Sequence, residues 1–158
     1  MRIGIGYDAH PLAPGRPLVL GGVHIPHDRG LEGHSDADAL AHAIVDALLG
    51  AAGLGDIGQH FPSSDPRLKG ATSLGFLEVT ARLLAQSGWR IVNVDATILA
   101  QSPRLSPHYE AMRHNIARAL GIDPARVSVK ATTTDGLGFE GRGEGIAAQA
   151  VALLEESG

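Results

Sequence analysis

The stretch that decides the fold reads Gly33-His34-Ser35-Asp36-Ala37-Asp38-Ala39-Leu40-Ala41-His42-Ala43-Ile44-Val45-Asp46-Ala47-Leu48-Leu49. Apolar residues recur there at helical spacing, which predicts a helix over about residues 36–52 with one buried face. Ser35 is the expected N-cap, and Asp38 three residues later completes a capping box. His42 falls at the edge of the buried face, with Asp38 and Asp46 four residues away on either side. A histidine in that position either completes a core by hydrogen bonding or binds a ligand.

Composition narrows the class of protein. The chain has 158 residues, and we expect one domain over residues 1–158 with a substantial core. The net charge of −4 argues against nucleic acid as the main partner. Because there is no cysteine, any tight metal site must use His, Asp, Glu or backbone ligands. No secretory leader or membrane-spanning apolar run is found, so we expect a soluble cytoplasmic protein without a membrane partner.

The first residues alternate in a strand pattern over residues 2–10. Asp8 and His10 then lie on the same face, about 7 Å apart. They are either the solvated end of a strand or a pair of metal ligands, and the spacing alone does not decide between the two.

The rest of the chain predicts one α/β (or α+β) domain without repeats. A Gly21-Gly22 turn predicts a hairpin, and residues 59–71 predict a mobile loop that is a connector or a lid. The tail over residues 143–155 fits a helix or a strand equally well. The further expected elements are a helix at 72–87, a strand at 89–99, a loop at 100–107, a helix at 107–120 and a strand at 127–131.

Two motifs near the C-terminus each have a structural and a functional interpretation. Residues 136–141 match the glycine pattern G-x-G-x-x-G, but too little chain follows to build a dinucleotide-binding unit, so a compact turn is expected. The preceding Thr132-Thr133-Thr134-Asp135 could hold phosphate oxygens and a hard cation. It could equally be ordinary strand sequence, because threonine favours strands.

Taken together, these segments resemble one family, the 2-C-methyl-D-erythritol 2,4-cyclodiphosphate synthases of the non-mevalonate isoprenoid pathway. The resemblance runs in order through nearly the whole chain. Its segments are Met1-Arg2-Ile3-Gly4, Asp8-x-His10, Gly33-His34-Ser35-Asp36-x-Asp38, His42, Asp46-Ala47-Leu48-Leu49-Gly50, Leu54-Gly55-Asp56-Ile57-Gly58, Phe61-Pro62, Asn93-Val94-Asp95, Lys130-Ala131-Thr132-Thr133-Thr134 and Leu137-Gly138-Phe139-x-Gly141-Arg142-Gly143-Glu144-Gly145-Ile146-Ala147.

The resemblance implies a lyase that cyclises 4-diphosphocytidyl-2-C-methyl-D-erythritol 2-phosphate and releases CMP. It implies that Asp8, His10 and His42 bind zinc and leave the fourth position for a phosphate oxygen. His34 and Thr133 would stabilise the transition state by donating hydrogen bonds to phosphate oxygens. Asp135 would help to hold a second divalent cation, magnesium or manganese, where the family usually has glutamate.

The resemblance also implies which residues contact the substrate. Asp56 and Gly58 would meet the methylerythritol part, residues 61–65 the lid, and residues 100–106 the cytosine and ribose, with Arg104 where lysine is usual. The full expected set is Asp8, Ala9, His10, His34, Ser35, Asp56, Ile57, Gly58, Phe61, Pro62, Ser63, Ser64, Asp65, Ala100, Gln101, Ser102, Pro103, Arg104, Leu105, Ser106, Thr132, Thr133, Thr134, Asp135, Phe139 and Arg142.

The fold that the resemblance implies is βαβαββ. It has a mixed four-stranded sheet with helices on one face, an N-terminal hairpin, and the tail as its last strand. Relatives of this kind are homotrimers whose sheets pack around a threefold axis, with active sites between subunits. Phe139, Arg142 and Glu144 would lie near that axis, where an isoprenoid diphosphate could bind in a central cavity.

Two other functions remain open from the residues. The first is a metal-dependent phosphohydrolase with Asp38 or Asp46 as general base. The second is a trimeric, non-enzymatic metal-binding module in which the metal is structural. In the synthase interpretation, Asp46 is expected either to orient the His42 imidazole from its position four residues away or to serve in helix packing.

Overall fold

The computed structural model describes the whole chain, residues 1–158. Its main sheet has the strand order β4-β1-β7-β5-β6. The bounds are β1 (Arg2–Pro14), β4 (Arg29–Leu31), β5 (Trp89–Leu99), β6 (Val127–Thr132) and β7 (Gly145–Glu156). The sheet is mixed, because β7 runs antiparallel to both β1 and β5 whereas β5 and β6 are parallel. The ambiguous tail is therefore a central strand, as the resemblance implied, and the four long strands are joined by one unexpected short strand, β4, at the edge of β1.

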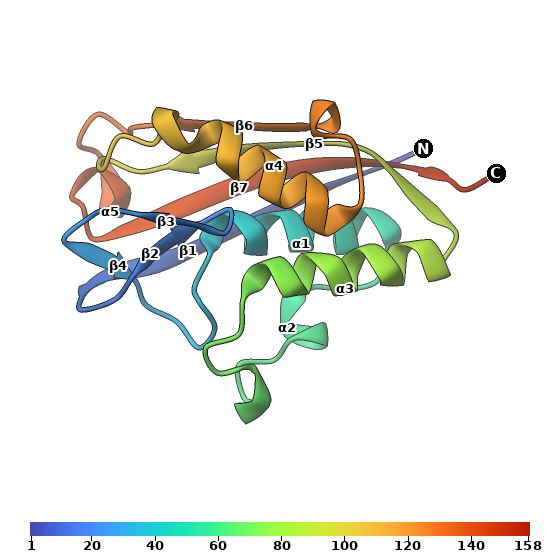
Figure 1. The fold of residues 1–158 in the computed structure, drawn as a ribbon, viewed down its shortest axis with the longest axis horizontal. Helices are drawn as coiled ribbons and strands as arrows, with labels where there is room; N and C mark the ends of the chain where they lie inside the picture. The colour runs from blue at the N-terminus through green and yellow to red at the C-terminus, as the bar shows by residue number, and fades with distance from the viewer.

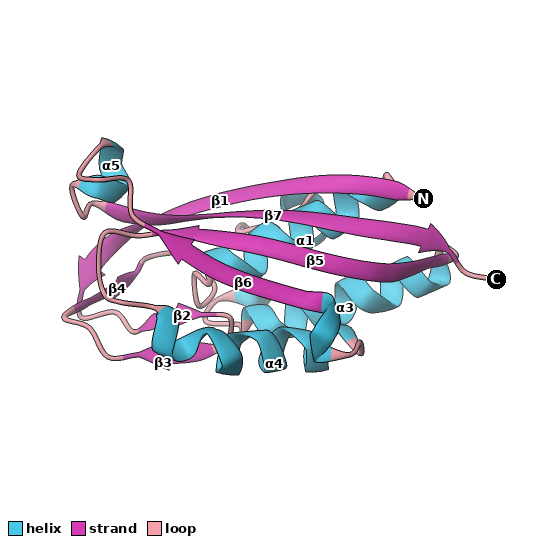
Figure 2. Ribbon diagram, turned by 90° about the horizontal axis from the view of Figure 1, so that it is seen from above, coloured by secondary structure: helices cyan, strands magenta, loops and turns pink.

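Helices cover only one face of this sheet. In Figure 1 the long strands β5, β6 and β7 lie along the top with α1 (Ala39–Ala52) and α3 (Ser73–Gln86) below them, and Figure 2 looks onto the other face, which no helix crosses. The third long helix, α4 (Tyr109–Leu120), packs along β6. The predicted hairpin is present as β2 (Leu18–Leu20) and β3 (Val23–Ile25), with Gly21 and Gly22 in its turn. None of the helices has the length and apolarity that crossing a membrane requires.

Helix α1 lies directly on β1 because two glycines of the strand face it. A Cβ atom on Gly4 would lie 2.0 Å from the carbonyl oxygen of Ala47, so no larger residue fits without moving the helix. The alternation of β1 then turns Asp8 and His10 toward the side on which α1 lies. The opposite face of the sheet leaves Ile3 and Ile5 72% and 65% exposed.

The start of α1 differs from the prediction. Asp38, not Ser35, is the N-cap, and residues 36–38 precede the helix instead of forming its first turn. The Asp38 side chain is fully buried and accepts hydrogen bonds from three backbone N–H groups, those of Gly21, Gly22 and Ala41. Burial raises the pKa of this carboxyl group to about 6. Asp38 therefore joins the hairpin turn to the helix, a long-range role that the capping-box pattern cannot reveal.

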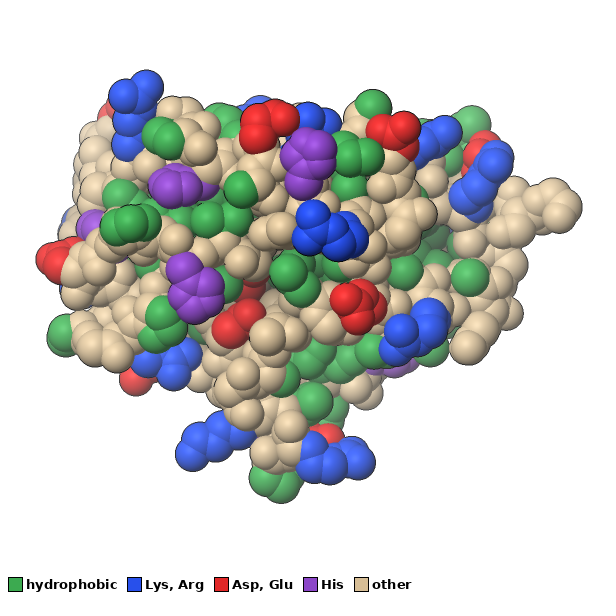
Figure 3. All heavy atoms as spheres, in the orientation of Figure 1, with side chains coloured by type: hydrophobic (Ala, Val, Ile, Leu, Met, Phe, Trp, Pro, Cys, Tyr) green, Lys and Arg blue, Asp and Glu red, His purple; other side chains and the backbone are tan.

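The segment predicted as a structureless loop over residues 59–71 contains short helices. These are α2 (Ile57–His60) and the 3-10 helix η1 (Pro66–Leu68), which are capped by the side chains of Asp56 and Asp65. Three further short elements lie elsewhere, η2 (Ser106–His108), η3 (Pro124–Arg126) and α5 (Gly138–Gly141). The segment projects below α2 in Figure 1, and Figure 3 shows Lys and Arg side chains gathered on this projection.

Candidate metal and substrate site

Three potential metal ligands from β1 and α1 converge on one point. The Asp8 Oδ2 atom lies 2.7 Å from His10 Nε2 and 3.1 Å from His42 Nδ1, and the two ring nitrogens are 3.3 Å apart. All three side chains are largely buried. Ligand atoms at about 2.0–2.1 Å from a tetrahedral zinc ion are about 3.3 Å from one another, so this triangle is close to what the metal requires. Two imidazoles and one carboxylate are also a donor set that suits zinc and similar divalent ions.

Hydrogen bonds on the far side of each ring orient the histidines for this role. His10 Nδ1 donates to the carbonyl oxygen of Glu32 at 3.0 Å, which leaves Nε2, the nitrogen beside Asp8, as the one that would bind the metal. His42 Nε2 lies 2.8 Å from Ser73 Oγ and 3.2 Å from Ser35 Oγ, which leaves Nδ1 for the metal. Fixing the tautomer through the second nitrogen is the usual way in which proteins prepare histidine ligands.

Electrostatics at the triangle favour an ionised carboxylate. Burial raises the pKa of Asp8, but its hydrogen bonds and charge interactions with His10 and His42 outweigh this effect and lower it to about 2. Burial lowers the pKa of His10, and its interactions with Asp8 outweigh that effect in turn, so the pKa of His10 is raised. The site therefore keeps a negative carboxylate in place against which a cation can bind.

A cavity of about 240 Å³ opens beside the triangle. Phe61 and Phe76 stack with ring centroids 4.4 Å apart, and Phe76 also stacks on His42. His34 reaches into this region, where its Nε2 atom lies 2.8 Å from the carbonyl oxygen of Asp65. The lining residues are His10, His34, Ser35, His42, Ile57, Gly58, Phe61, Ser63, Leu68 and Phe76.

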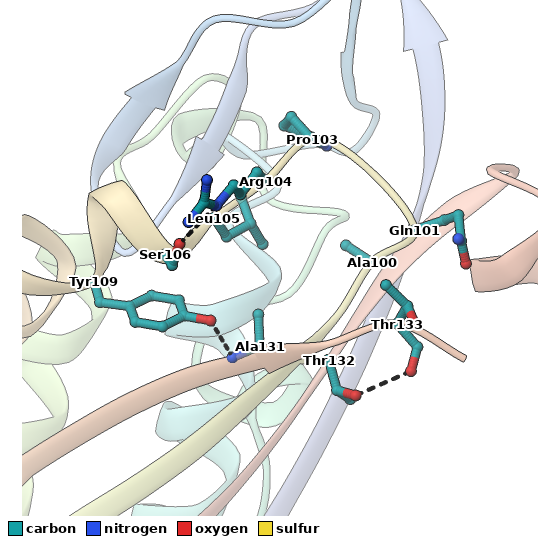
Figure 4. A pocket seen from close by; sticks show the side chains of 10 residues that line it. All are labelled: Ala100, Gln101, Pro103, Arg104, Leu105, Ser106, Tyr109, Ala131, Thr132 and Thr133. Carbon is teal, nitrogen blue, oxygen red and sulfur yellow. Dashed lines mark hydrogen bonds between the residues drawn. The ribbon is translucent and has the colours of Figure 1, made fainter. Parts of the chain in front are cut away.

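A second cavity of about 290 Å³ lies between the loop after β5 and the end of β6 (Figure 4). Figure 4 shows the ring of Tyr109 pointing at the edge of β6, where its hydroxyl accepts a hydrogen bond of 2.8 Å from the backbone N–H of Ala131. Arg104 turns back and donates to the Ser106 hydroxyl. The lining residues are Ala100, Gln101, Pro103, Arg104, Leu105, Ser106, Tyr109, Ala131, Thr132 and Thr133.

The residues expected from the sequence thus divide between two cavities that share no lining residue. In particular, His34 lines the first cavity and Thr133 the second, so a single chain does not bring them together in one pocket. Asp135 lies outside the metal triangle, with its carboxylate 3.4 Å from the Thr133 hydroxyl. The expected contact residues that line neither cavity are Asp8, Ala9, Asp56, Pro62, Ser64, Asp65, Ser102, Thr134, Asp135, Phe139 and Arg142.

Of the two roles expected for Asp46, the structure supports helix packing, and several contributing residues were not foreseen. Asp46 does not contact His42; its Oδ1 atom accepts a hydrogen bond of 2.7 Å from the N–H of Ile57 and so fixes the start of α2. The unforeseen residues are Asp36, Leu68, Ser73, Phe76, Tyr109 and Ala131. Asp36 lies in a segment of the family resemblance but was given no role there, and no local motif marks the others, because each reaches its cavity or the metal triangle only through the packing of distant elements.

Comparisons with known proteins found similar sequences and similar structures. The sequence model of the YgbB family matches residues 1–155. A protein of Syntrophomonas wolfei described as 2-C-methyl-D-erythritol 2,4-cyclodiphosphate synthase is 62% identical over 99% of this chain and 100% of its own length. The structure of the bifunctional IspDF from Campylobacter jejuni is 44% identical with a TM-score of 0.94, over 98% of this chain and 42% of that one. The CDP complex of IspF from Plasmodium falciparum is 36% identical with a TM-score of 0.87, over 99% and 97% of the two chains.

Proposed function

The chain belongs to the YgbB family, and from this premise we propose that it is a 2-C-methyl-D-erythritol 2,4-cyclodiphosphate synthase. It would cyclise 4-diphosphocytidyl-2-C-methyl-D-erythritol 2-phosphate by attack of the 2-phosphate on the β-phosphorus, with CMP as the leaving group. The reaction balances without a protein nucleophile, which suits a chain that has no cysteine. The observation that carries the proposal is the Asp8–His10–His42 triangle at the wall of a cavity of about 240 Å³.

We assign the metal-binding half of the site to residues of β1 and α1. Asp8, His10 and His42 would hold a zinc ion, whose positive charge would oppose the charge of a substrate phosphate. His34 would donate from its ring to a phosphate oxygen, and the Ser35 hydroxyl faces the same cavity. To act on substrate, His34 must exchange its partner, the carbonyl oxygen of Asp65, for a phosphate oxygen.

We assign the nucleotide-binding half to the second cavity. Its loop offers backbone groups of residues 100–106 to a base and ribose, and its strand end offers the Thr132 and Thr133 hydroxyls to phosphate oxygens. A relative whose structure is described as a CDP complex supports a cytidine nucleotide as the ligand. Asp135 follows Thr133 in this segment, and we propose that it helps to hold a second divalent cation, magnesium or manganese, on the diphosphate.

We further propose that the two halves meet across subunits of a homotrimer. Each chain carries both halves, but they lie in separate cavities. A complete site would therefore combine the metal-binding half of one copy with the nucleotide-binding half of its neighbour. The face of the sheet that no helix covers supplies an apolar surface for that contact, with Ile3, Ile5, Tyr7 and Val151 all exposed. A threefold assembly around this face would also enclose the end of the sheet where Phe139 and Arg142 lie, the expected position of an isoprenoid diphosphate.

The structure favours this proposal over a metal-dependent hydrolase. The two carboxylates that could serve as a general base are both engaged elsewhere. Asp38 is buried as a helix cap, and Asp46 is bonded to the backbone of α2. The site also differs from a purely structural zinc site, because structural sites are closed by four protein ligands. Here three candidate ligands lie beside an open cavity.

An assay of CMP release tests the proposed role of the metal. Protein stripped of metal by a chelator is expected to release no CMP from the cytidine-linked substrate, and protein resupplied with zinc and magnesium is expected to release it. CMP release that is unaffected by stripping would overturn the assignment of the triangle.

A further inference from the structure

The His42 imidazole is held from behind by a side-chain relay that reaches α3. Ser73, the first residue of α3, is fully buried, and its Oγ atom lies 2.8 Å from His42 Nε2. The same hydroxyl donates a short hydrogen bond to Asp36 Oδ1. The other oxygen of Asp36 accepts a 3.0 Å hydrogen bond from the backbone N–H of Ser73.

The donors and acceptors of this relay can be assigned one by one. A serine hydroxyl has a single proton, and here Ser73 gives it to the Asp36 carboxylate. The Ser73 oxygen can therefore only accept from His42, so the proton on that ring must sit on Nε2. In the metal-bound ring, which carries one proton, Nδ1 is then left with its lone pair for the metal on the side of Asp8 and His10.

We propose that Ser73 and Asp36 are positioning residues of the metal site, which set the tautomer, the ring angle and the basicity of His42. The inference rests on the proposed metal site and adds to it two residues from outside the metal triangle. The Asp36 carboxylate polarises the Ser73 hydroxyl and makes its oxygen a stronger acceptor for the imidazole proton. Partners of this kind typically contribute 10–100-fold to metal affinity, as a general magnitude.

The relay also ties the metal site to the projecting segment. The Asp36 N–H donates to the carbonyl oxygen of Ala71, and the Gly70 N–H donates to the carbonyl oxygen of His34. Residues 34–36 are thereby bonded to the last residues of the segment that carries η1. A change in the position of that segment would be passed to His42 through Ser73.

Asp36 has a structural task as well, so Ser73 gives the cleaner test. The residue before α3, Thr72, makes no side-chain capping bond, and Asp36 instead accepts from the first N–H of the helix. Removing Asp36 would therefore disturb α3 itself. Removing only the Ser73 hydroxyl leaves that capping bond in place.

The decisive experiment compares Ser73→Ala with Thr80→Ala, a matched control. Thr80 lies on the same helix and is equally buried, but its hydroxyl bonds to the carbonyl oxygen of Phe76 instead of to a metal ligand. Zinc affinity is measured by competition with a chromophoric chelator, and ligand geometry by the visible absorption spectrum of bound Co²⁺. We expect Ser73→Ala to lose about 10–100-fold in affinity and to change the Co²⁺ spectrum, and Thr80→Ala to match the wild type in both.

Ser73→Ala with wild-type affinity and an unchanged Co²⁺ spectrum would overturn the relay while leaving the metal site intact. A wild-type protein that binds no zinc would instead overturn the proposed function. If Ser73→Ala does not fold, Asp36→Asn takes its place, because the amide keeps the shape and one acceptor but loses the charge. Asp36→Asn is expected to weaken zinc binding measurably, and wild-type affinity in that variant would count against the proposal.

Discussion

Gly6 and Ala43 approach so closely that a Cβ atom on Gly6 would lie 1.9 Å from the Ala43 carbonyl oxygen. Asp8 is two residues beyond Gly6 on β1, and His42 immediately precedes Ala43 on α1. The contact therefore sets the distance between the strand that carries two of the candidate metal ligands and the helix that carries the third.

Gly6→Ala tests this relationship. The added methyl group must push α1 away from β1, and overpacking of this kind costs about 3 kcal/mol of the free energy of unfolding. We also expect weaker zinc binding, because His42 moves with the helix. Gly50→Ala in the same helix is the control, since nothing lies nearer than 4.0 Å to its added Cβ atom. It is expected to stabilise the protein by about 0.5–1 kcal/mol. A Gly6→Ala protein as stable as the wild type in chemical denaturation would contradict the account.

His42→Ala removes one of the three candidate ligands. We expect the zinc affinity to fall by more than the roughly 100-fold that outer partners contribute, turnover to be lost, and the circular dichroism spectrum to stay native. His114→Ala is the control, because His114 is about half exposed on α4 and its charged partner is Glu110, far from the metal triangle in the fold. A His42→Ala protein that keeps tight zinc binding would show that the metal is held elsewhere.

The zinc affinity should fall at low pH, because protonation of His10 competes with the metal. Asp8 raises that pKa above its usual value of 6.5 in spite of burial. Zinc must displace the proton, so affinity should decline as the pH falls through the raised pKa, beginning above pH 6.5. In metal-free protein, the His10 contribution to stability is complete below pH 6.5 and is lost as the pH rises through the raised pKa. Asp8→Asn removes the carboxylate that raises the pKa of His10, so the loss of zinc affinity in this variant should begin at a lower pH. Zinc titrations between pH 5.5 and 8 check this, and constant affinity across that range would refute it.

The assembly of the site from two chains can be tested by mixing inactive variants. His42→Ala disables the metal-binding half and Thr133→Ala the nucleotide-binding half, where loss of such a donor costs about 100–1000-fold. If each site forms between neighbours in a trimer, random mixing restores one intact site in every mixed trimer, or about a quarter of wild-type activity. Co-expression of His42→Ala with Asp8→Ala, which damages the same half twice, should restore nothing. No recovery in the first mixture would mean that each site is built within one chain.

The sequence predicted the long elements well because each carries its own periodic signal. The strand at 89–99, the helices near 72–87 and 107–120, and the glycine turn of the hairpin all appear where their patterns place them. The four-strand core, the tail strand and the pairing of His42 with Asp8 and His10 followed from the family resemblance, since spacing left each of them open.

The errors arose where a polar side chain acts over a long distance. Asp38 matched a local capping box with Ser35, yet its carboxylate also binds the hairpin turn at Gly21, and the helix begins later as a result. Asp46 matched a partner for His42 at helical spacing, but its carboxylate accepts a hydrogen bond from the N–H of Ile57. Ser73 was expected only as a possible helix cap, because its contact with His42 exists only once α3 packs against α1.

Phosphorus NMR of the reaction products tests the central claim most directly. The protein is incubated with 4-diphosphocytidyl-2-C-methyl-D-erythritol 2-phosphate, zinc and magnesium. We expect the signals of a cyclic diphosphate and of CMP in equal amounts. CMP together with an acyclic product and no cyclic diphosphate would show hydrolysis instead, and would contradict the synthase assignment.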